Sequence, residues 1–272
     1  DIYSRYPLTE KVITLSKQKY SFHWYHLWKK IKGTRWDVLC DLRSTPVTLL
    51  VRAKKRIILN KNKTSQHRVI GLAKLNPYSR NALPRIWLKK EDLNHGKNLL
   101  SGHSPPFFVI GPSANWEAKV WPEEYFTQLS KNIMNSNYFK GGTLIIVGGP
   151  GEEGVGKIIM KKLGEIQIIN LIGLPIIPTA AVFSFSKLYI GNDSGLMHLA
   201  ASIGTPTIGL FGPTDDIIYA PLGKNTMVVR TPESSEELMS DPDFNHRTSG
   251  SLMKSLTTNK VEKIAFEMLR KL

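Results

Sequence analysis

The chain has 272 residues, enough for one large or two ordinary domains, and 41% of them are hydrophobic, which excludes global disorder. Lys and Arg outnumber Asp and Glu by 37 to 22, and the net charge of +15 points to an anionic partner: a phosphorylated substrate, an acidic lipid surface or nucleic acid. The alternative explanation of the positive charge is that lysines are scattered over the chain without serving an anionic partner. The single cysteine, Cys40, excludes a disulfide scaffold and a cysteine-built zinc site.

The first hundred residues alternate short apolar segments with helical patterns. We expect strands at 12–15, 36–42 and 56–59, and helices at 22–31 and 47–53. Residues 60–104 are polar and irregular, and the Ser101–Pro106 run is the strongest boundary signal in the chain. No run approaches 18 apolar residues and the first residues lack the apolar core of a secretory signal, so neither a membrane span nor a signal peptide is expected.

From residue 105 onwards the pattern becomes regular. We expect strands at 107–110, 143–147, 168–172, 188–191 and 207–211. One expected helix begins at Pro122, and the others cover 153–163, 179–185, 194–203 and 260–272. Strands that alternate with helices in this way are typical of βαβ units and a parallel sheet. The sequence therefore predicts two α/β layers in series, residues 1–104 and 105–272, of which the first is short.

The Gly149–Gly154 segment matches G-x-G-x-x-G after a strand, as a dinucleotide fingerprint does. Glu152 and Glu153, however, put carboxylates where a pyrophosphate would lie, and the acid expected about 20 residues further on is absent. The near-match to a P-loop that ends in Lys157 fails as well, because Ile158 stands where Ser or Thr would hold magnesium. We interpret the segment as a Gly-rich turn between a strand and a helix.

Metal chemistry has little support in the sequence. Asp241-Pro242-Asp243 imitates the D-x-D signature of one glycosyltransferase class, but it lies in a polar stretch with no strand before it, so we interpret it as a solvated loop. No pattern typical of a metalloprotease, a serine hydrolase or a calcium loop occurs. We therefore expect no metal and no other cofactor.

The most informative segment is residues 188–201, where a hydrophobic strand ends in the polar turn Asn192–Gly195 and passes directly into a helix. Ser194 and Gly195 leave backbone N–H groups free at the helix start, which is a ready phosphate site. His198 lies one turn further along the same helical face and adds a donor or a charge. Asp193 is expected to cap the helix or to accept from a sugar hydroxyl. The alternative is an ordinary N-cap with His198 in the core.

Two further turns follow strands of the same predicted sheet. One is Gly111–Asn115 with Ser113, followed by Lys119; the other is Gly212–Asp215. In an open α/β sheet, ligands bind beyond the carboxyl ends of the strands. Three small and polar turns at three such ends therefore predict one common crevice.

At these residues the chain resembles the ADP-heptose:lipopolysaccharide heptosyltransferases of glycosyltransferase family 9. The specific part is G-N-D-S-G-L-M-H-L-A-A with G-T-P-T-I-G-L-F-G-P-T-D, residues 191–215; weaker parts are G-P-S-A…K-V-W-P-E and the strand W-D-V-L-C-D-L-R-S near Asp41. The resemblance implies a GT-B fold, in which two Rossmann-like domains face each other across a cleft. The C-terminal domain would hold the nucleotide-sugar and the N-terminal domain the acceptor.

The resemblance also implies roles for single residues. It puts Lys119 and Ser113 on the diphosphate, Asp193, Ser194, Gly195 and His198 around the phosphates and the sugar, and Thr214 and Asp215 near the same ligand. In this family the first strand leads into a turn with an Asp that acts as general base. This chain starts near the third strand, so we expect an incomplete N-terminal domain, a catalytic base upstream of Asp1, and donor binding without useful transfer. Asp41, at the carboxyl end of its strand, is the one stand-in, with a helix cap as its alternative role.

The resemblance thus implies an inverting transferase that moves a heptose or a related sugar from an ADP-sugar to the lipopolysaccharide inner core. We expect a cytoplasmic protein held at the inner-membrane surface, because its positive charge suits an anionic leaflet and a phosphorylated acceptor. The alternative is a non-catalytic nucleotide-sugar-binding remnant of that family. A nucleic-acid-binding protein is a third class that depends on charge alone, and no nucleic-acid partner is expected.

Overall fold

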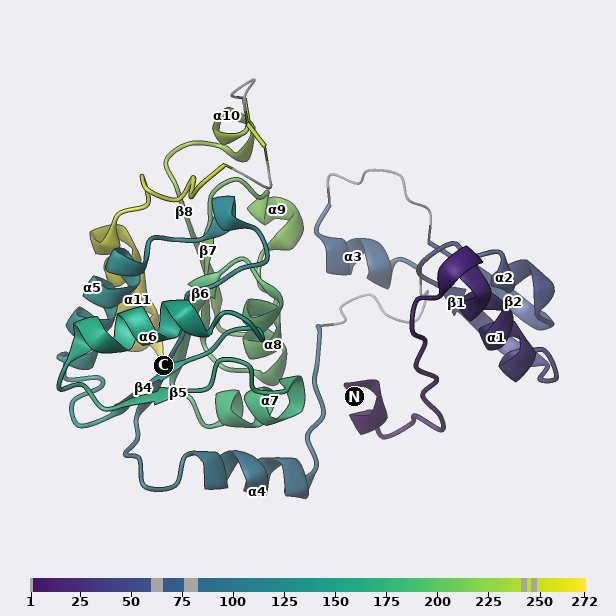
Figure 1. Ribbon diagram of the computed structural model, residues 1–272, viewed down its shortest axis with the longest axis horizontal. Coiled ribbons are helices and arrows are strands. Elements are labelled where there is room, and N and C mark those ends of the chain that lie inside the picture. Colours follow the sequence, from purple (N-terminus) through teal and green to yellow (C-terminus); the bar gives the residue numbers. More distant parts are fainter. Residues whose placement is uncertain (1, 60–65, 76–82, 241–243, 246–248) are drawn as a thin grey trace. The chain divides into compact units, whose positions relative to one another are not determined.

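A computed structural model describes residues 2–59, 66–75, 83–240, 244–245 and 249–272 (Figure 1). The chain divides into two compact units: unit 1 contains residues 1–7 and 83–272, and unit 2 contains residues 8–82. This division falls earlier than the boundary predicted after residue 104, because residues 83–104 pack with the sheet that follows them. Among the described residues, no helix is both long and apolar enough to cross a bilayer.

Unit 1 is built around a six-stranded, all-parallel sheet in the order β5-β4-β3-β6-β7-β8. Its strands are β3 (Phe107–Gly111), β4 (Thr143–Ile146), β5 (Ile168–Asn170), β6 (Leu188–Asn192), β7 (Thr207–Phe211) and β8 (Thr226–Arg230). Every residue of β3, β4, β6 and β7 is buried, as expected for apolar runs covered on both faces. From β3 the chain builds outwards in one direction and from β6 in the other, so the topological switch point lies between these two strands.

Helices cover both faces of this sheet (Figure 1). They are α5 (Glu123–Met134), α6 (Glu153–Leu163), α7 (Ile176–Ser184), α8 (Gly195–Ile203) and α11 (Thr258–Lys271). Unit 1 also contains α4 (Lys90–Leu99), which packs against α7, and the short η3 (Glu117–Lys119), α9 (Asp216–Tyr219) and α10 (Ser235–Leu238). One apolar core lies between the sheet and α5, α6 and α11, and a second lies between the sheet and α7 and α8. Unit 1 is therefore a doubly wound α/β domain.

Helix α4 was not predicted, because the segment 60–104 was interpreted as irregular. Gly96 and two asparagines weaken its helical pattern, and tertiary packing stabilises it instead: a Cβ at Gly96 would lie 2.8 Å from Ala181 Cβ on α7. A local signal was present, since Asp92 accepts from the Lys89 N–H in a capping box. Asp92 also receives two hydrogen bonds from Arg5, at 2.8 and 2.9 Å, which tie the N-terminal residues to unit 1.

Unit 2 contains a parallel pair of strands, β1 (Trp36–Asp41) and β2 (Ala53–Ile58). Its helical segments are α1 (Phe22–Ile31), α2 (Val47–Leu50), α3 (Arg68–Ala73) and the 3-10 turn η2 (Lys19–Ser21); a further such turn, η1 (Tyr3–Arg5), belongs to unit 1. The strand predicted at 12–15 is wrong: this segment is irregular, because neither β1 nor β2 hydrogen-bonds to it, and Val12 and Leu15 are exposed. Strand β8 and helix α10 are further elements that the sequence prediction missed.

Asp41 organises the turn between β1 and α2. Its carboxylate accepts from the backbone N–H groups of Arg43 (2.8 Å) and Thr45 (2.5 Å) and from the hydroxyls of Thr45 and Thr48. Desolvation alone would raise the pKa of Asp41, but the hydrogen bonds from Thr48, Arg43 and Thr45 outweigh it and lower this pKa to about 2. A carboxylate so fully engaged is a poor proton acceptor, so the structure favours the capping role over the stand-in base.

This network makes a prediction about acid stability. A folded pKa of about 2 against an ordinary 3.8 corresponds to about 2 kcal/mol of stability, present above pH 4 and lost as the pH falls through 2. We expect Asp41→Asn to remove this stability at pH 7 and to flatten the acid response, measured by hydrogen exchange of the amides in 41–50. A variant whose exchange between pH 4 and 2 follows that of the wild type would contradict the assignment.

Candidate nucleotide-sugar site

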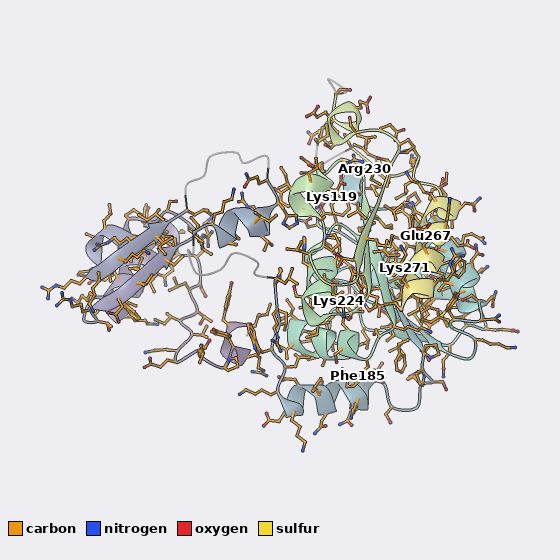
Figure 2. All side chains as sticks on the ribbon, turned by 180° about the vertical axis from the view of Figure 1, so that it is seen from behind. Lys119, Phe185, Lys224, Arg230, Glu267 and Lys271 are labelled. Carbon is orange, nitrogen blue, oxygen red and sulfur yellow. The ribbon has the colours of Figure 1, made fainter. Side chains whose placement is uncertain are left out.

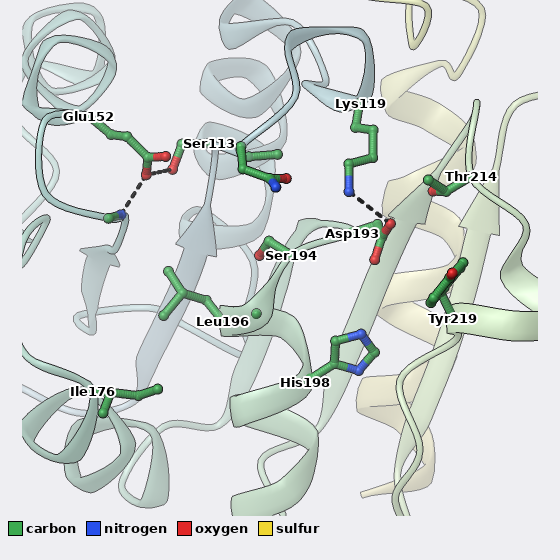
Figure 3. A pocket seen from close by; sticks show the side chains of 14 residues that line it. Ser113, Lys119, Glu152, Ile176, Asp193, Ser194, Leu196, His198, Thr214 and Tyr219 are labelled. Carbon is green, nitrogen blue, oxygen red and sulfur yellow. Dashed lines mark hydrogen bonds and ion pairs between the residues drawn. The ribbon is translucent and has the colours of Figure 1, made fainter. Parts of the chain in front are cut away.

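A pocket of about 680 Å³ lies in unit 1 beyond the carboxyl ends of β3, β4, β6 and β7, at the switch point of the sheet (Figure 3). Strands end here and helices begin, so backbone amides and turn side chains converge on one space. The pocket is lined by Ser113, Ala114, Asn115, Lys119, Gly149, Glu152, Ile176, Asp193, Ser194, Gly195, Leu196, His198, Thr214 and Tyr219.

A buried tyrosine shapes the ends of the two central strands. Gly111 and Gly191 pair with each other across β3 and β6, and a Cβ on either would lie within 2.4 Å of the Tyr189 hydroxyl. Only glycine therefore fits where these strands approach the pocket. Burial raises the pKa of Tyr189 and outweighs the opposing effect of a hydrogen bond with the Ser194 side chain, so the phenol stays protonated at any physiological pH.

The N-terminus of α8 opens into the pocket. Ser194 is its N-cap residue but makes no side-chain hydrogen bond to the first turn, and the Asp193 side chain is engaged elsewhere. The expectation that Asp193 caps this helix is therefore wrong. The first amides of α8, starting at the exposed Gly195, remain available to a bound anion, which the helix dipole also favours. Ser194 Oγ is buried and, apart from the neighbouring Tyr189 hydroxyl, has no hydrogen-bond partner among the described residues.

Lys119 and Asp193 form an ion pair inside the pocket, with Nζ and Oδ2 3.1 Å apart (Figure 3). Their side chains are only 13% and 9% exposed, so the charges meet in a partly desolvated space. Trp121 fixes the loop that carries Lys119, because its backbone N–H donates to Asn192 Oδ1 at 3.0 Å. Asn192 is the residue directly before Asp193 in the chain. The ammonium group of Lys119 therefore lies beside the N-terminus of α8, and the ion pair with Asp193 keeps it there.

A second carboxylate enters the pocket from the turn after β4. Glu152 Oε2 accepts from Ser113 Oγ and from the Gly149 N–H, both at 2.5 Å (Figure 3). The sequence interpretation of this turn as structural missed Glu152, although the rule that selected Ser113 and Asp193 applies to it equally: it follows the next strand of the sheet. Ser113 was expected on the diphosphate, whereas its hydroxyl is engaged by Glu152 here. The apolar side chains of Ile176 and Leu196 lie at the same end of the pocket.

The opposite end of the pocket is formed by His198, Thr214 and Tyr219 together with Asp193 (Figure 3). Asp215, expected near the ligand, does not line the pocket: it is the N-cap of α9, and its carboxylate accepts from the Ile217 N–H at 2.8 Å. Tyr219, at the last position of α9, was not predicted, since nothing in its local sequence marks it. Figure 2 shows Lys119 and Arg230 towards the edge of the sheet where the strands end, and Phe185 towards the opposite edge, where they begin.

Of the eight predicted site residues, the pocket brings together seven: Ser113, Lys119, Asp193, Ser194, Gly195, His198 and Thr214. The residues missed by the sequence reasoning include Glu152, Ile176, Leu196 and Tyr219. Within the described residues no group of three or more His, Cys, Asp or Glu side chains is arranged to hold a metal ion. The D-x-D-like pair Asp241 and Asp243 lies outside the described residues.

Residues 74–246, which include every residue of this pocket, match the model of glycosyltransferase family 9 (heptosyltransferase). The chain belongs to this family. It is similar to lipopolysaccharide heptosyltransferase 2 of Salmonella typhimurium, with 30% identity over 46% of this chain and 36% of that protein. It is also similar to lipooligosaccharide heptosyltransferase 2 of Haemophilus influenzae, with 27% identity over 72% of this chain and 57% of that protein. The chain thus matches less than two thirds of the length of these curated family members.

Solved structures of the family share the fold. A family 9 glycosyltransferase from Veillonella parvula superimposes with a TM-score of 0.81 at 18% identity, over 100% of this chain and 85% of that one. The E. coli heptosyltransferase WaaC with ADP gives a TM-score of 0.65 at 21% identity, over 90% and 77% of the two chains. The GT-B-like α/β fold expected from the sequence is confirmed.

Proposed function

We propose that unit 1 binds the nucleotide-sugar donor of an inverting glycosyltransferase, with ADP-heptose or a related ADP-sugar as the donor. The observation that carries the proposal is the position of the pocket: a cation, Lys119, and the uncapped N-terminus of α8 lie together at the switch point of a parallel sheet. That combination suits a diphosphate, whose charge the helix dipole and the ammonium group both stabilise. The ADP in the WaaC structure supports adenine as the base.

The two ends of the pocket differ in a way that orients the donor. Glu152 offers a carboxylate that can accept from the ribose hydroxyls, as acidic residues do in other nucleotide-binding α/β folds, and Ile176 and Leu196 offer apolar surface to the base. We therefore place the nucleoside at the Glu152 end and the transferred sugar at the Asp193 and His198 end. In this placement the Ser113 hydroxyl orients the Glu152 carboxylate by its hydrogen bond and does not bind the diphosphate.

In this arrangement the chain's own residues favour departure of the diphosphate. As the bond from the sugar to the phosphate breaks, negative charge grows on the leaving diphosphate, where Lys119 and the α8 amides lie preorganised. These groups stabilise that charge without a metal. We accordingly propose that donor binding needs no divalent cation.

The acceptor and the membrane surface are proposed as partners of unit 2. Residues 8–82 carry 17 Lys and Arg against three Asp and Glu, so nearly all of the net charge of +15 lies in this unit. A phosphorylated lipopolysaccharide inner core, at the anionic cytoplasmic face of the inner membrane, is the partner that this charge favours. Unit 1 is close to neutral and owes its anion binding to the local arrangement in the pocket.

Donor binding is tested by calorimetric titration of ADP and ADP-heptose, each with and without EDTA. We expect both to bind, with affinities unchanged by the chelator, because the described pocket offers a cation and amides for the diphosphate. Loss of binding in EDTA would contradict the metal-free site. Transfer is tested separately by ADP release with an inner-core acceptor. Release faster than from the Lys119→Ala variant would support transfer and contradict the expectation of donor binding without useful transfer; release no faster would support that expectation and leave donor binding standing.

A further inference from the structure

The end of the pocket at Tyr219 has a feature that nucleotide binding leaves unused. The Tyr219 ring lines the pocket beside His198 and Thr214, yet 42% of its surface is exposed to solvent (Figure 3). Thr214 Oγ1, on the same wall, is buried and has no hydrogen-bond partner among the described residues. An exposed aromatic face next to an unused hydroxyl is a surface with both apolar and polar capacity.

Several contacts hold Tyr219 in place. It lies on α9, which has four residues and is too short to be stable by itself. Asp215 caps this helix, and Asp216 forms an ion pair with Arg230. Arg230 also donates to the carbonyls of Gly212 (3.2 Å) and Glu233 (3.1 Å), which ties the loop before α9 to the segment after β8. The side chain is therefore presented on a fixed support, as a preorganised contact requires.

We propose that Tyr219 and Thr214 form the selectivity element for the transferred sugar. A pyranose has hydroxyl groups at its edge and an apolar C–H face; the Tyr219 ring covers the apolar face and Thr214 Oγ1 bonds to one hydroxyl. Asp193 and His198 lie on the same wall; the carboxylate of Asp193 accepts hydrogen bonds from the remaining hydroxyls, and the imidazole of His198 donates to them. The proposal rests on the proposed function, since it assumes that the nucleoside occupies the Glu152 end.

The test compares the affinities of ADP and ADP-heptose, measured by calorimetry, in the wild type and in Tyr219→Ala, Tyr219→Phe and Thr214→Val. For Tyr219→Ala we expect ADP-heptose to bind roughly 5- to 10-fold more weakly and ADP to bind within twofold of the wild type, because only the sugar meets the ring. Tyr219→Phe, which keeps the ring, should match the wild type for both ligands. Thr214→Val should weaken ADP-heptose about fivefold and leave ADP unchanged.

Glu152→Gln is the matched control at the nucleoside end. It should weaken ADP and ADP-heptose by the same factor, since the ribose belongs to both. Equal losses for both ligands in Tyr219→Ala would put Tyr219 on the nucleotide, and no loss for either would remove it from the site; either result overturns the proposal. If the wild type binds no ADP at all, the proposed function fails as a whole, which is distinguishable from failure of the selectivity element alone.

Discussion

Replacing Lys119 by alanine is expected to weaken ADP binding by roughly 10- to 150-fold, the range for a hydrogen bond to a charged group of about 1.5–3 kcal/mol. The variant loses the cation beside the N-terminus of α8, and it also leaves Asp193 in the pocket without its partner. That carboxylate, 9% exposed, would then repel the diphosphate. Calorimetric titration of ADP measures the effect directly.

Two further variants make this result specific. Lys157→Ala removes an exposed lysine of α6, next to the Gly-rich turn that imitates a P-loop, and should leave the affinity for ADP nearly unchanged. Lys119→Arg keeps a cation and should recover part of the affinity. Comparable losses in Lys157→Ala and Lys119→Ala would instead assign the phosphates to the Gly149–Gly154 turn.

Replacing Trp121 by alanine is expected to lower the free energy of unfolding of unit 1 by about 3–5 kcal/mol. Trp121 is fully buried, packs edge-to-face on Phe126, and donates from Nε1 to the carbonyl of Leu256 at 2.7 Å. Truncation leaves a cavity and an unpaired carbonyl. The backbone N–H of residue 121, which donates to Asn192, remains in the variant, but the indole that anchors the loop carrying Lys119 is lost, so ADP binding should weaken even where the variant remains folded.

Urea denaturation of the wild type and of the variant measures this loss. Trp87→Ala is the control, because it makes the same chemical change in the same unit at a half-buried side chain that contacts Tyr6. We expect it to cost clearly less than Trp121→Ala. Equal costs for the two tryptophans would show that the loop between β3 and α5 is not anchored as described.

The sheet of unit 1 was predictable because its strands are continuous apolar runs bounded by glycine and proline. The segments at Phe107, Leu188 and Thr207 are buried on both faces, and such strands keep a clear local signal. Helix α4 was missed because its stability depends on contact with α7 at Gly96, which no local pattern records. The strand expected at 12–15 has apolar residues but no partner strand in the described part of the chain.

The site was partly predictable for a related reason. Ser113 and Asp193 stand at ends of parallel strands, and topology alone brings such turns together. Pairings between distant residues remained hidden: Lys119 and Asp193 are 74 positions apart, and Ser113 and Glu152 are 39 apart. Tyr219 enters the pocket through a short helix whose position depends on Arg230, and no spacing in the sequence reports that contact.

A crystal structure of the chain with ADP would show directly where the nucleotide lies in unit 1. We expect the diphosphate at the first turn of α8, with an oxygen within hydrogen-bonding distance of Lys119 Nζ and the ribose beside Glu152. A diphosphate bound by the Gly149–Gly154 turn would contradict this expectation. So would ADP bound anywhere outside the pocket that extends from Glu152 to Tyr219.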